Sequence, residues 1–154
     1  MNGTVCARLD SMADGTKKVL VVEDNAEWRE LLTMIIRRSG HEVVTAGTGK
    51  EGIRQASMTH PDLILMDLGL PEMSGDKATA HIKEDPATKH IPVVVQTAFG
   101  SGPLAIRAIE AGAAEIMHKP ISIADIQKLL SKYLSGGDRK PKTDVTHYFT
   151  GSAL

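Results

Sequence analysis

The stretch Val19-Leu-Val-Val-Glu-Asp-Asn25 places a continuous apolar run directly before two acidic residues. A run that is apolar at every position is typical of a strand covered on both faces, as in a parallel sheet. Further short runs rich in Val, Ile and Leu follow at Val43–Val44, Leu63–Met66, Val93–Val95 and Ile116–Met117. The sequence therefore predicts five buried, parallel strands.

Segments with helical spacing separate these runs. The first, Ala26–Ser39, carries its apolar residues on one stripe and is followed by Gly40, a helix stop signal. That predicted stripe consists of Leu31, Leu32, Ile35 and Ile36. The remaining predicted helices are Gly49–Met58, Ser74–Glu84 with an N-cap serine, Gly102–Ala111, and Ile123–Leu134 with Ser122 as N-cap. Strands that alternate with helices in this way predict right-handed crossovers and a three-layer α/β sandwich.

The composition fits one globular domain and excludes several classes of protein. The 154 residues are 42% hydrophobic and 24% charged, which argues against disordered and collagen-like chains. Lys and Arg total 18 against 19 for Asp and Glu, so the chain has no excess of positive charge with which to bind nucleic acid. The single cysteine, Cys6, excludes an internal disulfide and a cysteine-based zinc cage.

No run of 18 apolar residues occurs, so we expect no membrane span. The segment Met1–Lys17 lacks the apolar core of a secretory signal, and a cytoplasmic location is the expectation that follows.

Polar side chains stand where four of the five predicted strands end. Glu23 and Asp24 follow the first, Asp67 the third, Thr97 the fourth and Lys119 the fifth. A doubly wound sheet binds ligands beyond the carboxyl ends of its strands, so these residues are predicted to share one site. Three acidic side chains at one edge repel one another unless a cation neutralises them, and oxygen ligands without cysteine favour Mg²⁺.

A carboxylate beside Mg²⁺ is suited to attack a phosphoryl group and form an acyl phosphate. Lys119 would offset charge on the transferring oxygens, and the Thr97 hydroxyl would donate a hydrogen bond to the same group.

Four stretches of this sequence resemble the receiver domain of response regulators, over about Lys17 to Leu134. They are Val19–Asn25, Leu65-Met-Asp-Leu-Gly-Leu-Pro-Glu-Met-Ser-Gly75, Thr97-Ala98 and Lys119-Pro120. The resemblance implies a flavodoxin-like α/β fold, a doubly wound (βα)5 sandwich with a parallel five-stranded sheet in the order 2-1-3-4-5.

The resemblance also implies roles for the acidic residues. Asp67 matches the aspartate that accepts the phosphoryl group in this family. Glu23 and Asp24 match the acidic pair that binds Mg²⁺, together with Asp67 and the backbone carbonyl of Gly69.

Three further positions match the family and two depart from it. Thr97 matches the switch hydroxyl, Lys119 the lysine that pairs with the phosphoryl group, and Pro120 the proline that commonly follows a cis bond. Ile116 stands where the family often has a switch aromatic, so signalling is expected to depend more on Thr97 and the loop Ala98–Pro103. Gly69 and Phe99 stand in the two positions that often tune phosphoryl lifetime in the family. Gly69 cannot shield the phosphoryl bond, whereas Phe99 would limit water access, so together they predict no particular lifetime.

The predicted organisation is a flexible arm at 1–16, a receiver domain at 17–135 and a tail at 136–154 without an output domain. Trp28, one helical turn beyond Asp24, is expected close enough to the acids to report metal binding. The predicted function is that of a single-domain response regulator of a two-component system. It would receive its phosphoryl group from a histidine kinase or phosphotransfer protein and signal to a downstream protein through protein contacts; a homodimer stays open.

Two alternatives to this function remain in view. The first is a receiver-like docking or dimerisation module that is never phosphorylated; retention of all the acidic, hydroxyl and lysine positions counts against it. The second is an enzyme with a released substrate, such as an aspartyl phosphatase of the haloacid dehalogenase class. The Asp-x-Asp motif of that class is missing here, because Glu23-Asp24 follows the first strand. A receiver catalyses only its own phosphorylation and dephosphorylation.

Overall fold

A computed structural model describes residues 16–98 and 102–135. The predicted arm up to residue 15, the predicted tail at 136–154, and Phe99 with residues 100 and 101 of the predicted switch loop lie outside the described residues. The expectations attached to those segments therefore stay predictions.

Five parallel strands form one sheet in the order β2-β1-β3-β4-β5, as predicted. The strands are β1 (Lys18–Val22), β2 (Glu42–Ala46), β3 (Leu63–Asp67), β4 (Val93–Thr97) and β5 (Glu115–His118). The helices between and after them are α2 (Ala26–Arg38), α3 (Gly49–Thr59), α4 (Gly75–Glu84), α5 (Pro103–Glu110) and α6 (Ile123–Leu134). The architecture is the flavodoxin-like, doubly wound sandwich.

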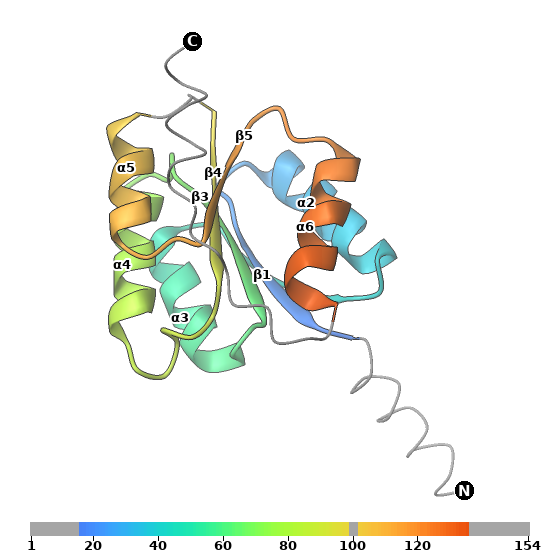
Figure 1. The fold of residues 1–154 in the computed structure, drawn as a ribbon, viewed down its shortest axis with the longest axis horizontal. Helices are drawn as coiled ribbons and strands as arrows, with labels where there is room; N and C mark the ends of the chain where they lie inside the picture. Colours follow the sequence, from blue (N-terminus) through green and yellow to red (C-terminus); the bar gives the residue numbers. More distant parts are fainter. Residues whose placement is uncertain (1–15, 99–101, 136–154) are drawn as a thin grey trace, which may run out of the picture.

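The helices cover both faces of the sheet, and each face has its own apolar core. Figure 1 shows α2 and α6 on one face and α3, α4 and α5 on the other. Alternate residues of β4 serve the two cores: Val93 and Val95 pack toward α4 and α5, whereas Val94 packs toward α2 and α6. All five residues of β3 and of β4 are buried, which explains their continuous apolar runs.

Two features of the predicted strands and helices are corrected. Strand β2 is an edge of the sheet, so Val43 and Val44 are only half-buried, although each packs against one of the two cores. Leu31, predicted on the inner stripe of the first helix, is 41% exposed. The buried stripe of α2 follows the spacing of Leu32, Ile35 and Ile36, and Leu31 projects to one side of it.

The helix termini follow the sequence signals with one exception. Ser122 and Asp125 form a reciprocal capping box at the start of α6. Ser74 occupies the N-cap position of α4 but makes no side-chain capping bond, so the predicted cap is positional only. Gly40, after α2, has a φ of 92°, a left-handed backbone that glycine adopts without a side-chain clash.

Candidate functional site

The polar residues predicted at the strand ends lie together at the carboxyl edge of the sheet. Glu23 and Asp24 follow β1, Asp67 is the last residue of β3, Thr97 is the last of β4, and Lys119 follows β5. The order of the sheet places β1, β3 and β4 side by side. Because each helical crossover returns the chain to the same end of the sheet, the strands are parallel and their carboxyl ends share one edge. The structure therefore groups every predicted side chain of the site.

Glu23, Asp24 and Asp67 form an acidic cluster. One carboxylate oxygen from each lies within 4.8 Å of the other two. Glu23 is 1% and Asp67 6% exposed, whereas Asp24 is exposed at the rim. Two buried carboxylates and one at the surface leave an open approach for a cation with oxygen ligands.

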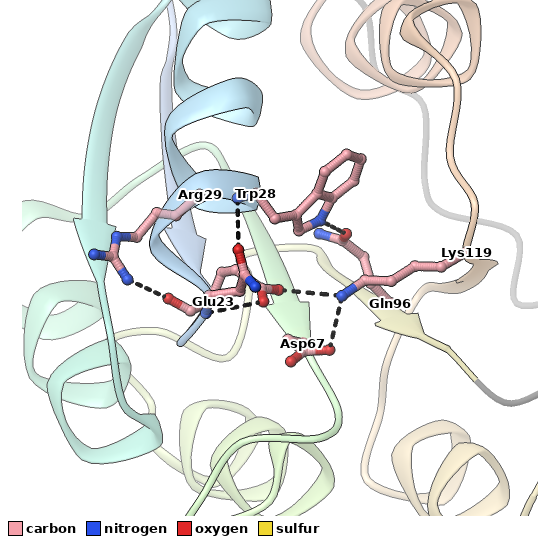
Figure 2. A network of polar contacts seen from close by, with 7 residues as sticks. Glu23, Trp28, Arg29, Asp67, Gln96 and Lys119 are labelled. Atoms are coloured by element: carbon pink, nitrogen blue, oxygen red, sulfur yellow. Dashed lines mark hydrogen bonds and ion pairs between the residues drawn. The ribbon is translucent and has the colours of Figure 1, made fainter.

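Lys119 is the cation that the chain itself supplies to this cluster. Its Nζ lies 3.4 Å from Oε2 of Glu23 and 3.5 Å from Oδ1 of Asp67 (Figure 2). One ammonium between two carboxylates compensates half of their charge, and Asp24 adds a third negative charge. The cluster therefore retains net negative charge.

The pKa values of both buried acids are raised, mainly by burial. Burial, and then the charge of Asp67, raises the pKa of the Glu23 carboxyl, although Lys119 and the Asn25 amide act in the opposite direction. Burial likewise raises the pKa of the Asp67 carboxyl against the effects of Lys119 and the Gly69 amide, and Asp24 raises it further. A cation bound beside them would favour the charged form of both carboxyls and so lower their pKa values.

Backbone bonds fix Glu23 in place. Its amide donates to the carbonyl of Ala46 on β2 at 3.0 Å. Its Oε1 accepts from the Asn25 amide at 3.2 Å, and its carbonyl accepts from the Arg29 guanidinium at 2.7 Å. Asn25 also caps α2, since its side-chain oxygen accepts from the Trp28 amide at 2.8 Å. The turn after β1 therefore both starts α2 and orients the Glu23 carboxylate.

The chain beyond Asp67 is held by β4 and α4. The amide of Leu68 donates to the Gln96 carbonyl at 2.9 Å, and the amide of Gly75 donates to the Leu68 carbonyl at 3.1 Å. Gly75 begins α4 so close to β3 that a Cβ there would clash with the carbonyl of Asp67. Glycine is therefore required at this position for α4 to start beside the site.

Thr97 and Lys119 are brought together by the β4–β5 pair. Thr97 lies opposite His118 in the register and is 8% exposed. The Lys119 amide donates to the Thr97 carbonyl at 2.8 Å, and the bond between Lys119 and Pro120 is cis, as the family resemblance implied. Ile116, in place of the family aromatic, is buried in the core that faces α4 and α5.

Sequence reasoning missed one member of the site. Gln96, directly before Thr97, is fully buried, and its Oε1 accepts from Trp28 Nε1 at 3.0 Å. The Trp28 ring lies beside Lys119, with its centroid 5.8 Å from Nζ, and Lys119 in turn contacts Glu23 and Asp67. The use of Trp28 as a reporter of metal binding stays a prediction. A glutamine that follows three valines in a buried strand was the available signal, because a buried amide needs a reason.

Residues 19–131 match the family model described as the response regulator receiver domain. The chain belongs to this family.

Relatives and solved structures agree with this membership. The chain is 39% identical over 119 residues to the polar-differentiation response regulator DivK of Brucella ovis, covering 77% of this chain and 97% of the relative. It is similar to the receiver domain of a sensor histidine kinase from Pseudomonas aeruginosa PAO1, whose crystal structure has magnesium coordinated in the active site cleft. That likeness has a TM-score of 0.73 at 26% identity, over 79% of this chain and all of the other. The phosphorylated cyanobacterial phytochrome response regulator RcpA is similar at a TM-score of 0.69 and 30% identity, over 79% and 96% of the two chains.

In the described residues, 16–98 and 102–135, no helix is long and apolar enough to cross a membrane.

Proposed function

We propose that this receiver accepts a phosphoryl group on the Asp67 carboxylate, in a reaction that requires Mg²⁺, and signals through protein contacts. The donor would be a phosphohistidine of a sensor kinase or phosphotransfer protein, and the reader a downstream protein. The observation that carries the proposal is the position of Lys119, within 3.5 Å of both buried acids of a three-carboxylate cluster.

The residues present fit a magnesium ion. Glu23, Asp24 and Asp67 offer three carboxylates, and Gly69 would add its backbone carbonyl, so all protein ligands are hard oxygens. Bound there, Mg²⁺ supplies positive charge that neutralises the phosphoryl oxygens and the cluster itself. The magnesium in the similar histidine-kinase receiver supports this assignment.

In the proposed transfer, an Asp67 carboxylate oxygen attacks phosphorus. A phosphorus–oxygen bond forms, the phosphorus–nitrogen bond of the donor breaks, and the leaving imidazole keeps the bonding pair and takes a proton. Lys119 would pair with a phosphoryl oxygen and the Thr97 hydroxyl would donate to another. Hydrolysis of the resulting acyl phosphate by water returns the free carboxylate, so no substrate other than the donor is processed.

We further infer that residues 17–135 act as a single-domain regulator. The chain covers 97% of the DivK relative, a protein of similar extent, and this coverage supports output by contact with another protein.

Labelling with a small phosphodonor such as acetyl phosphate tests the proposal. We expect labelling that requires Mg²⁺ and is lost in Asp67→Asn. Asp62→Asn is the matched control, because Asp62 is exposed at the opposite end of the same strand. Equal labelling of Asp67→Asn and the parent would refute Asp67 as the acceptor, and absence of labelling in a correctly folded parent would favour the unphosphorylated docking module.

A further inference from the structure

Trp28 and Gln96 form a polar contact beside the site that the proposed function does not use. Trp28 comes from the first turn of α2 and Gln96 from β4. Figure 2 shows the indole N–H directed at the Gln96 side-chain oxygen and the Lys119 side chain extending beside the ring. The contact therefore joins α2, β4 and the residue after β5.

Burial of the Gln96 side chain is energetically unfavourable. Gln96 is fully buried and two residues along β4 from Val94, on the face of the sheet that packs against α2 and α6. Its oxygen is used by Trp28, but its Nε2 has no hydrogen-bond partner within the part of the chain that the structure describes. An apolar side chain would avoid the cost of burying that amide. The contact with Trp28 is what the glutamine gains.

Lys119 needs positioning. Lysine is a compact charge on a long flexible stem, and this one keeps a quarter of its side chain exposed. Its separations of 3.4 and 3.5 Å from Glu23 and Asp67 are long for charged hydrogen bonds, which are about 2.7–2.9 Å. The two carboxylates attract the ammonium without fixing its position, so a third contact can determine where it lies.

We propose that Trp28, oriented by Gln96, positions the Lys119 ammonium between Glu23 and Asp67. The indole face attracts the cation at 5.8 Å and closes one side of the space into which the stem could turn. The hydrogen bond from Nε1 to Gln96 sets the angle of that face. Trp28 and Gln96 are thus positioning residues that act through Lys119, and their effect on phosphoryl transfer rests on the proposed function.

The contact itself is tested without any activity. A ring over Lys119 shifts its Hε resonances upfield in a ¹H–¹³C spectrum of the full chain, with the signal assigned through Lys119→Arg. We expect Trp28→Leu to abolish the shift and Gln96→Leu to reduce it. Lys132, whose Nζ lies 5.5 Å from the Tyr133 ring, is the internal control and should not change in either variant. A Lys119 shift that persists in Trp28→Leu would overturn the proposal.

The consequence is tested by the rate of labelling with acetyl phosphate and Mg²⁺. A cation–π contact of the usual strength corresponds to a rate lowered about three- to tenfold in Trp28→Leu. Trp28→Phe keeps an aromatic face but loses the N–H, so its rate should fall between those of Trp28→Leu and the parent. Leu31→Ala, on the exposed side of the same helix, is the control and should label like the parent.

Two further measurements separate positioning from folding. Gln96→Leu removes the unpaired Nε2 amide but also the acceptor of the Trp28 N–H, so we expect its stability in urea to stay close to that of the parent while labelling is slower. In a Lys119→Met background, Trp28→Leu should cause no further loss if it acts through Lys119.

The proposal would be overturned if Gln96→Leu labels more slowly only because it is less stable. It would also be overturned if Trp28→Leu slows labelling as much in the Lys119→Met background as in the parent. If the folded parent is not labelled at all, the proposed function fails, and the Lys119 shift alone decides whether Trp28 holds the lysine.

Discussion

At the scale of single residues, the site has more negative charge than its own cation balances. Glu23 and Asp67 are buried beside Asp24, and Lys119 is the one cation in salt-bridge range of the two buried acids among the described residues. Burial is the largest cause of the raised pKa of both buried carboxyls, and the neighbouring acids raise these pKa values further. Without a bound cation, such a cluster of acids lowers the stability of the folded protein.

Glu23→Gln should therefore stabilise the metal-free protein. A carboxyl whose pKa is raised by folding makes the folded state less stable as pH rises through that pKa, and glutamine removes this cost. We expect a rise in Tm of about 2–6 °C at neutral pH by calorimetry without metal. With saturating Mg²⁺ the parent should equal or exceed the variant. An unchanged or lower Tm in metal-free buffer would show that burying the Glu23 carboxylate does not destabilise the folded protein.

His41 provides a second effect of pH, at the opposite end of the sheet. Its Nδ1 accepts from the Lys17 amide at 3.2 Å, and burial lowers its pKa; the Asp62 charge opposes this and the Lys17 ammonium adds to it. Because the unfolded chain binds this proton more readily, His41 contributes stability above about pH 6.5 that is lost as pH falls below it.

The stability difference between the parent and His41→Gln, measured in urea, should shrink from pH 8 to pH 5.5. His90→Gln, at an exposed position, provides the comparison. A constant difference across this range would show that His41 does not titrate differently on folding.

At the scale of elements, the site depends on where each helix begins. Asn25 starts α2 beside Glu23, and Gly75 starts α4 against the backbone of Asp67. Neither helix can shift along the sheet without moving an acid. The sequence placed the acidic pair directly before the first helix but did not predict the Asn25 cap, and the close approach of Gly75 to Asp67 depends on packing between β3 and α4.

Gly75→Ala should be destabilising and should disturb the site. The added Cβ would clash with the Asp67 carbonyl, so α4 must move outward, at a cost of about 1–3 kcal/mol in urea unfolding. We also expect Gly75→Ala to bind Mg²⁺ more weakly, as measured by a titration of Trp28 fluorescence. Gly47→Ala is the control, because its Cβ would meet its nearest neighbour, Arg29, at an ordinary 3.6 Å. Equal stability of the two variants would refute the close-packing argument.

The elements were largely predictable and their mutual contacts were not. Runs such as Val93–Val95 identified buried strands because both faces of the inner strands are covered. Leu31 was misplaced because several apolar residues crowd one part of α2, and only packing against the sheet selects Leu32 and Ile35. The Trp28–Gln96 bond joins residues 68 positions apart, and no local pattern indicates such a pairing.

At the scale of the whole molecule, one five-stranded sheet with an apolar core on each face carries the site at its carboxyl edge. The acids reach it from β1 and β3 and the lysine from the turn after β5, so the site is predictable once the strand order is known. The strand order followed from the family resemblance, and the side-chain distances required the folded structure. Binding at this edge is linked to the stability of the entire domain.

Magnesium should accordingly raise the stability of the whole domain. Binding to the folded state alone adds about 2.7 kcal/mol when the free ion is at 100 times its Kd. We expect the urea midpoint to rise with Mg²⁺ in the parent and to respond much less in Asp24→Asn. Asp85→Asn, in the turn after α4, serves as control and should respond like the parent. A midpoint independent of Mg²⁺ would exclude the proposed metal site.

Locating the phosphoryl group tests the central claim most directly. After incubation with acetyl phosphate and Mg²⁺, borohydride reduction converts an aspartyl phosphate to homoserine, which peptide mass spectrometry places in the sequence. We predict homoserine at residue 67 in the parent, and none at that position without Mg²⁺ or without the phosphodonor. Homoserine at another aspartate, or a phosphoryl group on a residue outside the acidic cluster, would contradict the assignment of Asp67 as the phosphoacceptor.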